Sequence, residues 1–124
     1  MTDIITYDEK LKRIKKEIKR LKQIYKDIQE EHRDITAGLI QRAAYMRVEL
    51  EIYEEDLALY GYVEPFTQSP NTPPYDRERP VARLYNSMNK NYQSIIKQLT
   101  DLIPKETVKP DDDGFESFVG GRGD

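Results

Sequence analysis

The sequence contains no cysteine and a single histidine, His32. A chain without cysteine can form neither a disulfide framework nor a thiolate metal site, and one histidine cannot supply a histidine metal cluster. His32 falls on an apolar stripe, where a packed or interfacial role is expected rather than a catalytic one. We therefore expect no metal, no cofactor and no catalytic residue.

Long apolar runs and glycine-rich loops are also missing. No apolar run approaches the roughly 18 residues of a membrane span, and residues 1–6 lack the basic-then-apolar layout of a signal peptide. The glycines lie at Gly38, Gly61 and in the C-terminal tail, so no glycine loop can cradle a phosphate. These absences predict a soluble, intracellular protein that is not an enzyme.

An apolar stripe with alternating steps of three and four runs through the first 39 residues, which is the period of a helix with a coiled-coil-like contact face. Beyond residue 39 the apolar positions change phase, which indicates a turn between two helices. We predict this turn near residues 26–30, with Asp27 and Glu30 as a capping box, and keep a turn at 34–38 as the alternative. The stripe comprises Ile4, Tyr7, Leu11, Ile14, Ile18, Leu21, Tyr25, Ile28, His32, Ile35 and Leu39.

The predicted fold is all-α, in one domain over residues 1–104. Helices at about 7–26 and 30–60 form a long antiparallel hairpin, with Thr6 or Asp3 as the first cap and Gly61 as the end of the second helix. Residues 61–79 carry four prolines and are expected to be an irregular connector, neither helix nor sheet. A third amphipathic helix follows at 80–103, starting with Pro80, and residues 105–124 form a flexible acidic and aromatic tail.

The first helix carries an excess of basic side chains. Like charges four residues apart, such as Lys12 with Lys16, destabilise a helix by roughly 0.2 to 0.5 kcal/mol each, so something outside the helix should offset them. A hairpin turning near Ile28 sets these residues opposite 30–46, where charges nearly cancel, and leaves the acidic cluster at 49–56 beyond their reach. Two partners that would neutralise these basic residues remain as alternatives: the acidic helix of a neighbouring subunit, or the phosphates of DNA. The candidate DNA-binding residues are Lys12, Arg13, Lys15, Lys16, Lys19, Arg20 and Lys22.

In the tail, Phe115 and Phe118 stand three residues apart among four acidic residues. A segment this polar cannot bury its aromatic rings alone, and the spacing would place both rings on one side of an induced helical turn. We predict that Phe115 and Phe118 form a docking motif for a partner protein.

Several stretches of the chain follow the pattern of one known family. They are 79–81, Tyr85, Asn86, Tyr92 and 96–104 in the third helix, 112–119 in the tail, and 38–40 and 43–46. In this ordered combination they resemble the small terminase subunits of tailed double-stranded-DNA phages or prophages. The resemblance implies a non-enzymatic DNA-packaging component that assembles into a homo-oligomeric ring and binds double-stranded viral DNA in the host cytoplasm. It also implies that this component regulates the large terminase subunit, which would dock on the tail. The compact N-terminal helix-turn-helix of many members is not found, which favours contacts to the DNA backbone over reading of bases.

A second interpretation is an oligomeric helical adaptor whose charged helices make only contacts between subunits, without direct DNA contact. Both interpretations predict an oligomer, because three thin apolar stripes in a chain of 124 residues cannot all be buried internally.

Overall fold

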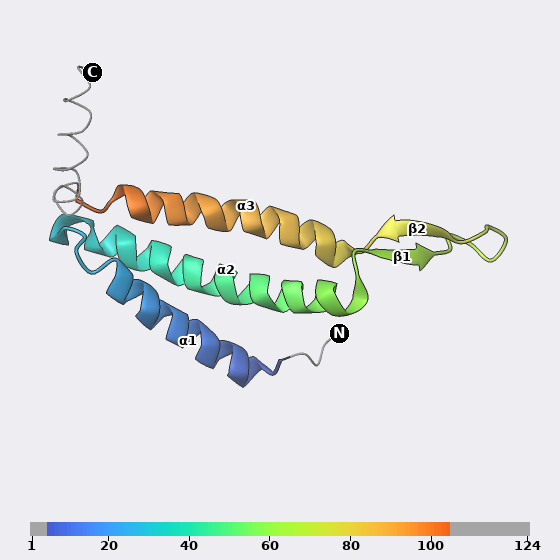
Figure 1. The fold of residues 1–124 in the computed structure, drawn as a ribbon, viewed down its shortest axis with the longest axis horizontal. Helices are drawn as coiled ribbons and strands as arrows, with labels where there is room; N and C mark the ends of the chain where they lie inside the picture. The colour runs from blue at the N-terminus through green and yellow to red at the C-terminus, as the bar shows by residue number, and fades with distance from the viewer. Residues whose placement is uncertain (1–4, 105–124) are drawn as a thin grey trace, which may run out of the picture.

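The computed structural model describes residues 5–104, and this part of the chain is mostly helical, as predicted. Helix α1 spans Tyr7–Ile24 and is followed by a short 3-10 helix, η1, at Glu30–His32, which leads directly into α2 at Arg33–Tyr60. Two strands come next, β1 at Val63–Phe66 and β2 at Tyr75–Glu78, and α3 spans Pro80–Asp101 (Figure 1).

Local capping chemistry sets three of the helix ends where the sequence places them. The hydroxyl of Thr6 accepts a hydrogen bond from the backbone N–H of Glu9 at 3.1 Å, which fixes the start of α1. Gly61 ends α2 with a φ of 82°, a backbone conformation open to glycine, and its N–H donates to the Leu57 carbonyl. Pro80 occupies the first turn of α3, where its missing N–H costs nothing.

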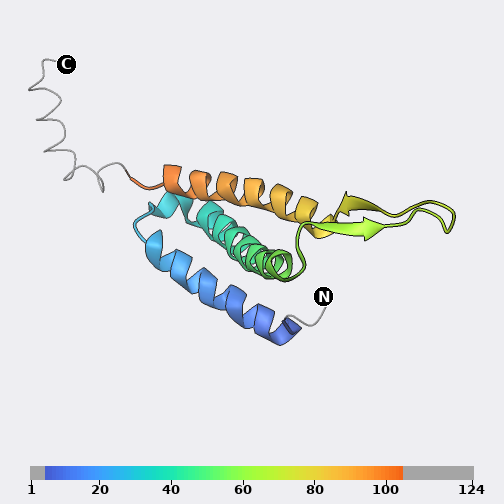
Figure 2. The ribbon, with the colours of Figure 1, turned by 45° about the vertical axis from the view of Figure 1, so that its right-hand side comes forward.

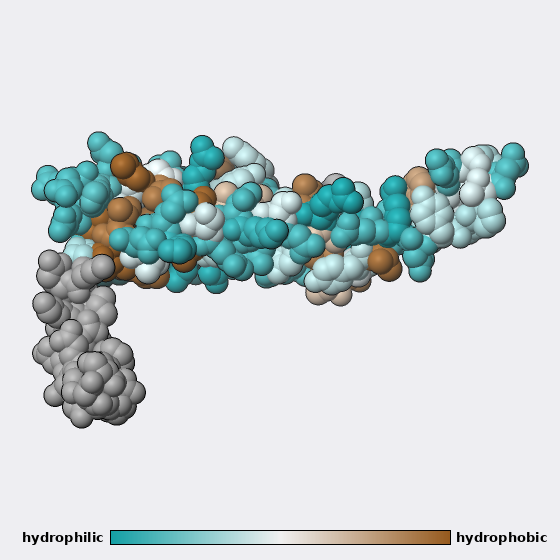
Figure 3. All heavy atoms as spheres, turned by 90° about the horizontal axis from the view of Figure 1, so that it is seen from above, coloured by the Kyte–Doolittle hydropathy of each residue, from teal (hydrophilic) through white to brown (hydrophobic). Residues whose placement is uncertain are grey.

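Helix α2 lies between α1 and α3 and buries side chains against both (Figures 1 and 2). The three helices meet at the end of the bundle that holds the α1–α2 turn and the last turn of α3. Toward the other end α1 diverges from α2, which leaves Tyr7 73% exposed. On the face drawn in Figure 3, hydrophobic residues gather at the end where the helices meet. The buried cluster comprises Leu21, Tyr25, Ile28, Ile40, Ala43, Ala44 and Leu99.

The turn between α1 and α2 occupies residues 25–29, close to the predicted position, but its details differ. The capping box was wrong, because η1 starts after Gln29 and no side chain caps it. The alternative turn at 34–38 is also wrong, since α2 continues through Gly38. The turn breaks the helical phase of the stripe, so His32 is only partly buried and Ile35 is 61% exposed.

The connector at 61–79 is not irregular throughout, which corrects the sequence-based expectation. Strands β1 and β2 pair antiparallel in the register Val63 with Glu78 through Phe66 with Tyr75. Three of the four prolines fall in the loop between the strands, and Pro65 is tolerated because both strands of a two-stranded sheet are edges. The hairpin projects from the end of the bundle as an arm (Figure 1).

Side chains on the arm stabilise its pairing from one strand to the other. The rings of Phe66 and Tyr75 meet edge to face with centroids 5.8 Å apart, and the Arg77 guanidinium lies 3.8 Å from the centroid of Phe66. Arg77 also donates to Glu64 at 2.8 Å. An isolated two-stranded hairpin is marginal in water, so these contacts support a segment that has little core of its own.

The base of the arm is fixed to α2 through Arg79. This guanidinium donates to the buried carboxylate of Asp56 at 2.7 Å and to the Gly61 carbonyl at 2.7 Å. Asp56 is only 1% exposed, so its charge depends on this partner for compensation. The contact ties the end of α2 to the residue that precedes α3.

Candidate nucleic-acid interface

Helix α1 presents three different sides, which follow from its sequence at about 100° per residue. Its apolar stripe faces the other helices, with Leu21 buried and Ile14 and Ile18 packed against the core cluster. A second side faces α2 with polar groups. On the remaining side five lysines fall within an arc of about 120°, calculated from the same helical period. We call this the lysine face: Lys12, Lys15, Lys16, Lys19 and Lys22.

The side that faces α2 makes ion pairs with the acidic cluster of α2. Lys10 pairs with Glu49, which is buried, and the Arg13 guanidinium donates to Glu51. The prediction that the basic side chains of the first helix would lie out of reach of this acidic cluster was wrong. The turn and η1 together lengthen the connection, which moves the acidic part of α2 into register with the N-terminal half of α1.

Arg20 is paired within its own helix. Its Nε and Nη2 donate to the two carboxylate oxygens of Glu17 at 2.9 and 2.7 Å, a bidentate contact. The hydrogen bond to Glu17 raises the pKa of Arg20 above its ordinary value. Of the seven candidate DNA-binding residues, Arg13 and Arg20 therefore already have carboxylate partners.

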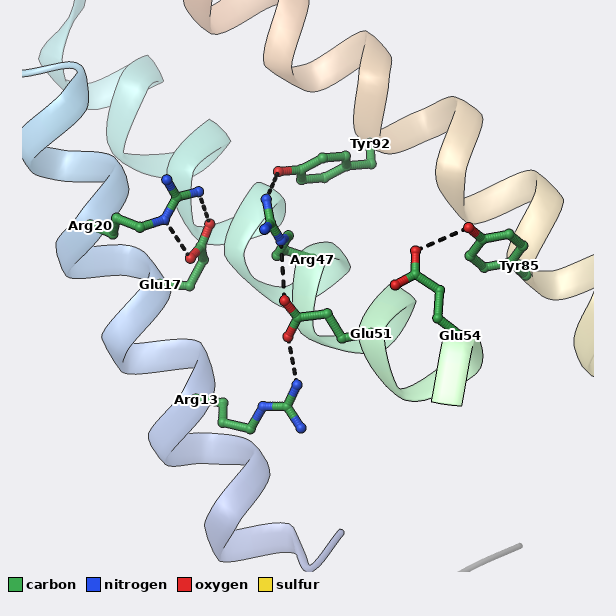
Figure 4. A network of polar contacts seen from close by, with 8 residues as sticks. All are labelled: Arg13, Glu17, Arg20, Arg47, Glu51, Glu54, Tyr85 and Tyr92. Atoms are coloured by element: carbon green, nitrogen blue, oxygen red, sulfur yellow. Dashed lines mark hydrogen bonds and ion pairs between the residues drawn. The ribbon is translucent and has the colours of Figure 1, made fainter. Parts of the chain in front are cut away.

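A polar network joins all three helices across the middle of the bundle (Figure 4). Glu51 accepts hydrogen bonds from Arg13 of α1 and from Arg47 of its own helix, and Arg47 also donates to the Tyr92 hydroxyl of α3 at 3.4 Å. Burial raises the pKa of Glu51, but the hydrogen bonds from the two arginines outweigh it, so the pKa lies below its ordinary value. Glu51 thus stays ionised at neutral pH and holds two guanidinium groups in place.

The lysine face differs from the rest of α1 because its charges are not compensated. All five side chains are exposed, and none forms an ion pair with any residue between 5 and 104. Lys12 with Lys16 and Lys15 with Lys19 are like-charge pairs one turn apart. The face is a continuous positive surface of the kind that phosphates neutralise.

An open groove of about 650 Å³ adjoins the lysine face, between α1 and α2. Five basic and two acidic side chains line it, together with Ile24 and Val48. Lys16 and Lys19 belong both to the groove and to the lysine face. The groove therefore combines a positive rim with apolar surface.

The sequence reasoning missed Arg47 and Glu51 as members of this site. Their spacing of four residues within one helix was a visible signal for a local pair. The contact of Glu51 with Arg13, 38 residues away, had no such signal. The candidate partner-binding residues Phe115 and Phe118 lie outside the described residues.

Comparison with known proteins found no matching family model, no matching curated protein and no matching solved structure. Within residues 5–104, no three His, Asp or Glu side chains are grouped as a metal site. None of the described helices has the length and apolar character needed to cross a membrane.

Proposed function

We propose that this protein is a non-enzymatic, oligomeric DNA-packaging component of a tailed phage or prophage, which binds double-stranded DNA through the lysine face. The resemblance to small terminase subunits supports this assignment and supplies the expected partner, the large terminase subunit, and the expected location, the host cytoplasm.

The observation that carries the proposal is the uncompensated charge of the lysine face. Ion pairs with α2 neutralise the charges of Lys10 and Arg13. The five lysines of the lysine face stay exposed on another side of α1. Lysines on a regular helix face contact phosphates as point charges and carry little information about bases. We therefore expect binding that depends weakly on DNA sequence.

Reversing the charge of three central lysines should abolish most of this binding. If each phosphate contact contributes about 1 kcal/mol, Lys15→Glu, Lys16→Glu and Lys19→Glu together weaken affinity by about a hundredfold or more. Fluorescence anisotropy with a labelled duplex measures the change. The matched control reverses three exposed cations on α2 and α3, Arg33→Glu, Arg42→Glu and Lys90→Glu, with the same change in net charge.

Equal losses in the two triple variants would mean that only net charge matters, which contradicts a specific lysine face. Unchanged DNA binding by the first variant would favour the second candidate function, a helical adaptor. That alternative has its own support, because exposed Glu54 and Glu55 on α2 could receive the lysines of a neighbouring subunit.

The apolar surface left exposed in one chain predicts self-association. Tyr7, Leu59 and Leu84 are 73%, 65% and 54% exposed, on three different helices. We expect gel filtration coupled to light scattering to give a closed oligomer, in keeping with the ring implied by the resemblance. The oligomer should persist in high salt, because apolar contacts are not screened. A monomer at tens of micromolar would contradict the prediction.

A further inference from the structure

The groove between α1 and α2 holds more positive charge than its own carboxylates neutralise. Arg20 is paired with Glu17, but Glu51 alone serves both Arg13 and Arg47. Lys16 and Lys19 have no acidic partner among residues 5–104. An occupant with several negative charges would complete this surface.

The groove also offers apolar contact between its cations. Ile24 is 50% exposed and lines the groove together with buried Val48. The guanidinium groups of Arg13 and Arg47 lie along the same groove, held by Glu51 (Figure 4). Aromatic rings can pack on aliphatic side chains and against guanidinium planes, so an acidic occupant with aromatic residues fits better than a purely charged one.

One segment of this chain has that composition. Residues 111–118 contain Asp111, Asp112, Asp113 and Glu116 together with Phe115 and Phe118. The segment carries no basic residue, so its charge is opposite to that of the groove along its whole length.

The described chain ends near the C-terminal end of α1. Thr100, near the end of α3, lies 3.4 Å from the Tyr25 hydroxyl, and Leu102 and Ile103 pack against the cluster that contains Tyr25. Tyr25 directly follows Ile24, which lines the groove. Six residues at 105–110 can span up to about 20 Å, whereas Arg20 lies only about 8 Å along α1 from Tyr25.

We propose that residues 111–118 occupy this groove within the same chain, with their acids against Lys16, Lys19 and the arginines and their rings on Ile24. In that position the tail covers two lysines of the lysine face and competes with DNA phosphates. A short tether gives an effective concentration in the millimolar range, so a weak contact is enough to fill the groove. The competition with DNA rests on the proposed function, whereas the docking itself does not.

The absence of native cysteine permits a direct test in the full-length chain. Gln23→Cys places a thiol on the groove, and Ser117→Cys places one between the two phenylalanines. Under mild oxidation we expect a disulfide within one chain to form about tenfold faster than in the control pair Gln41→Cys with Ser117→Cys, because docking raises the local thiol concentration. Gln41 is exposed on α2 and does not line the groove.

Equal rates in the two pairs would overturn the docking, and a disulfide between two chains would replace it with docking onto a second copy. Asp111→Lys, Asp112→Lys and Asp113→Lys should remove the rate difference. Persistence of the difference would contradict the charge complementarity.

The effect on DNA is measured separately with Phe115→Ala and Phe118→Ala in the full chain. A groove that is filled about nine-tenths of the time lowers apparent affinity about tenfold, so this variant should bind a labelled duplex about tenfold more tightly. Unchanged affinity would overturn the competition. If the disulfide forms preferentially but neither protein binds DNA, the proposed function fails while the docking stands.

Discussion

Raising the salt concentration from 50 to 200 mM is expected to weaken duplex DNA binding by about five hundredfold for each subunit that engages five phosphates. Each phosphate neutralised by a lysine releases condensed counterions, and the logarithm of affinity falls with the logarithm of salt by about 0.9 per contact. The five members of the lysine face therefore predict a slope of about −4.5 per bound subunit. A titration by fluorescence anisotropy at four or more salt concentrations measures it.

Single substitutions test whether each charge belongs to the interface. Lys16→Gln and Lys19→Gln should each reduce the magnitude of the slope by at least about 0.9, since one released counterion is lost per subunit. Arg20→Gln is the matched control, because Arg20 is already neutralised by Glu17 in a bidentate pair. If the unsubstituted protein gives a shallow dependence of affinity on salt and Lys16→Gln does not change it, the lysine face does not contact phosphates.

Replacing Arg79 by methionine is expected to lower the free energy of unfolding by about 3 kcal/mol, because breaking a buried ion pair leaves a charge without compensation. Asp56 would lose its 2.7 Å partner while remaining almost fully buried. The Gly61 carbonyl would lose a hydrogen bond as well, which frees the base of the arm. Urea denaturation followed by circular dichroism measures the loss, which corresponds to a fall of about 12 °C or more in Tm.

Arg83→Met is the matched control for Arg79→Met. Arg83 lies on the same part of the chain, but its side chain is 82% exposed and 3.5 Å from Glu78, so its removal should change stability by less than about 0.5 kcal/mol. Combining Asp56→Leu with Arg79→Met should recover much of the loss, because replacing both partners removes the unpaired charge. Equal stability of the two single variants would disprove a structural role for the Asp56–Arg79 pair.

The sequence by itself determined the features that depend only on residues close together along the chain. The spacing of apolar residues predicted three helices, and the chemistry of Thr6, Gly61 and Pro80 placed three of their ends. The lysine face is equally local, because residues three, four and seven positions apart share one side of any α-helix. These properties need no knowledge of what the helix packs against.

The arm shows where local signals were insufficient. Proline count alone suggested an irregular connector, but only Pro65 lies in a strand, at an edge that does not require its N–H. Pairing of Glu64 with Arg77 and of Phe66 with Tyr75 depends on residues brought together across the loop. The position of each proline relative to the pairing, rather than its number, decided the outcome.

Only the tertiary structure decided which charges of α1 are compensated. The register of α1 on α2 depends on the length and path of residues 25–32, and a shift of less than one turn changes which side chains meet. That register brings Lys10 to Glu49 and Arg13 to Glu51 and leaves the lysine face without partners within the described chain. Helical spacing fixes which residues share a face, whereas the packing of one helix on another fixes which face is neutralised, because ion pairing requires contact within a few ångströms.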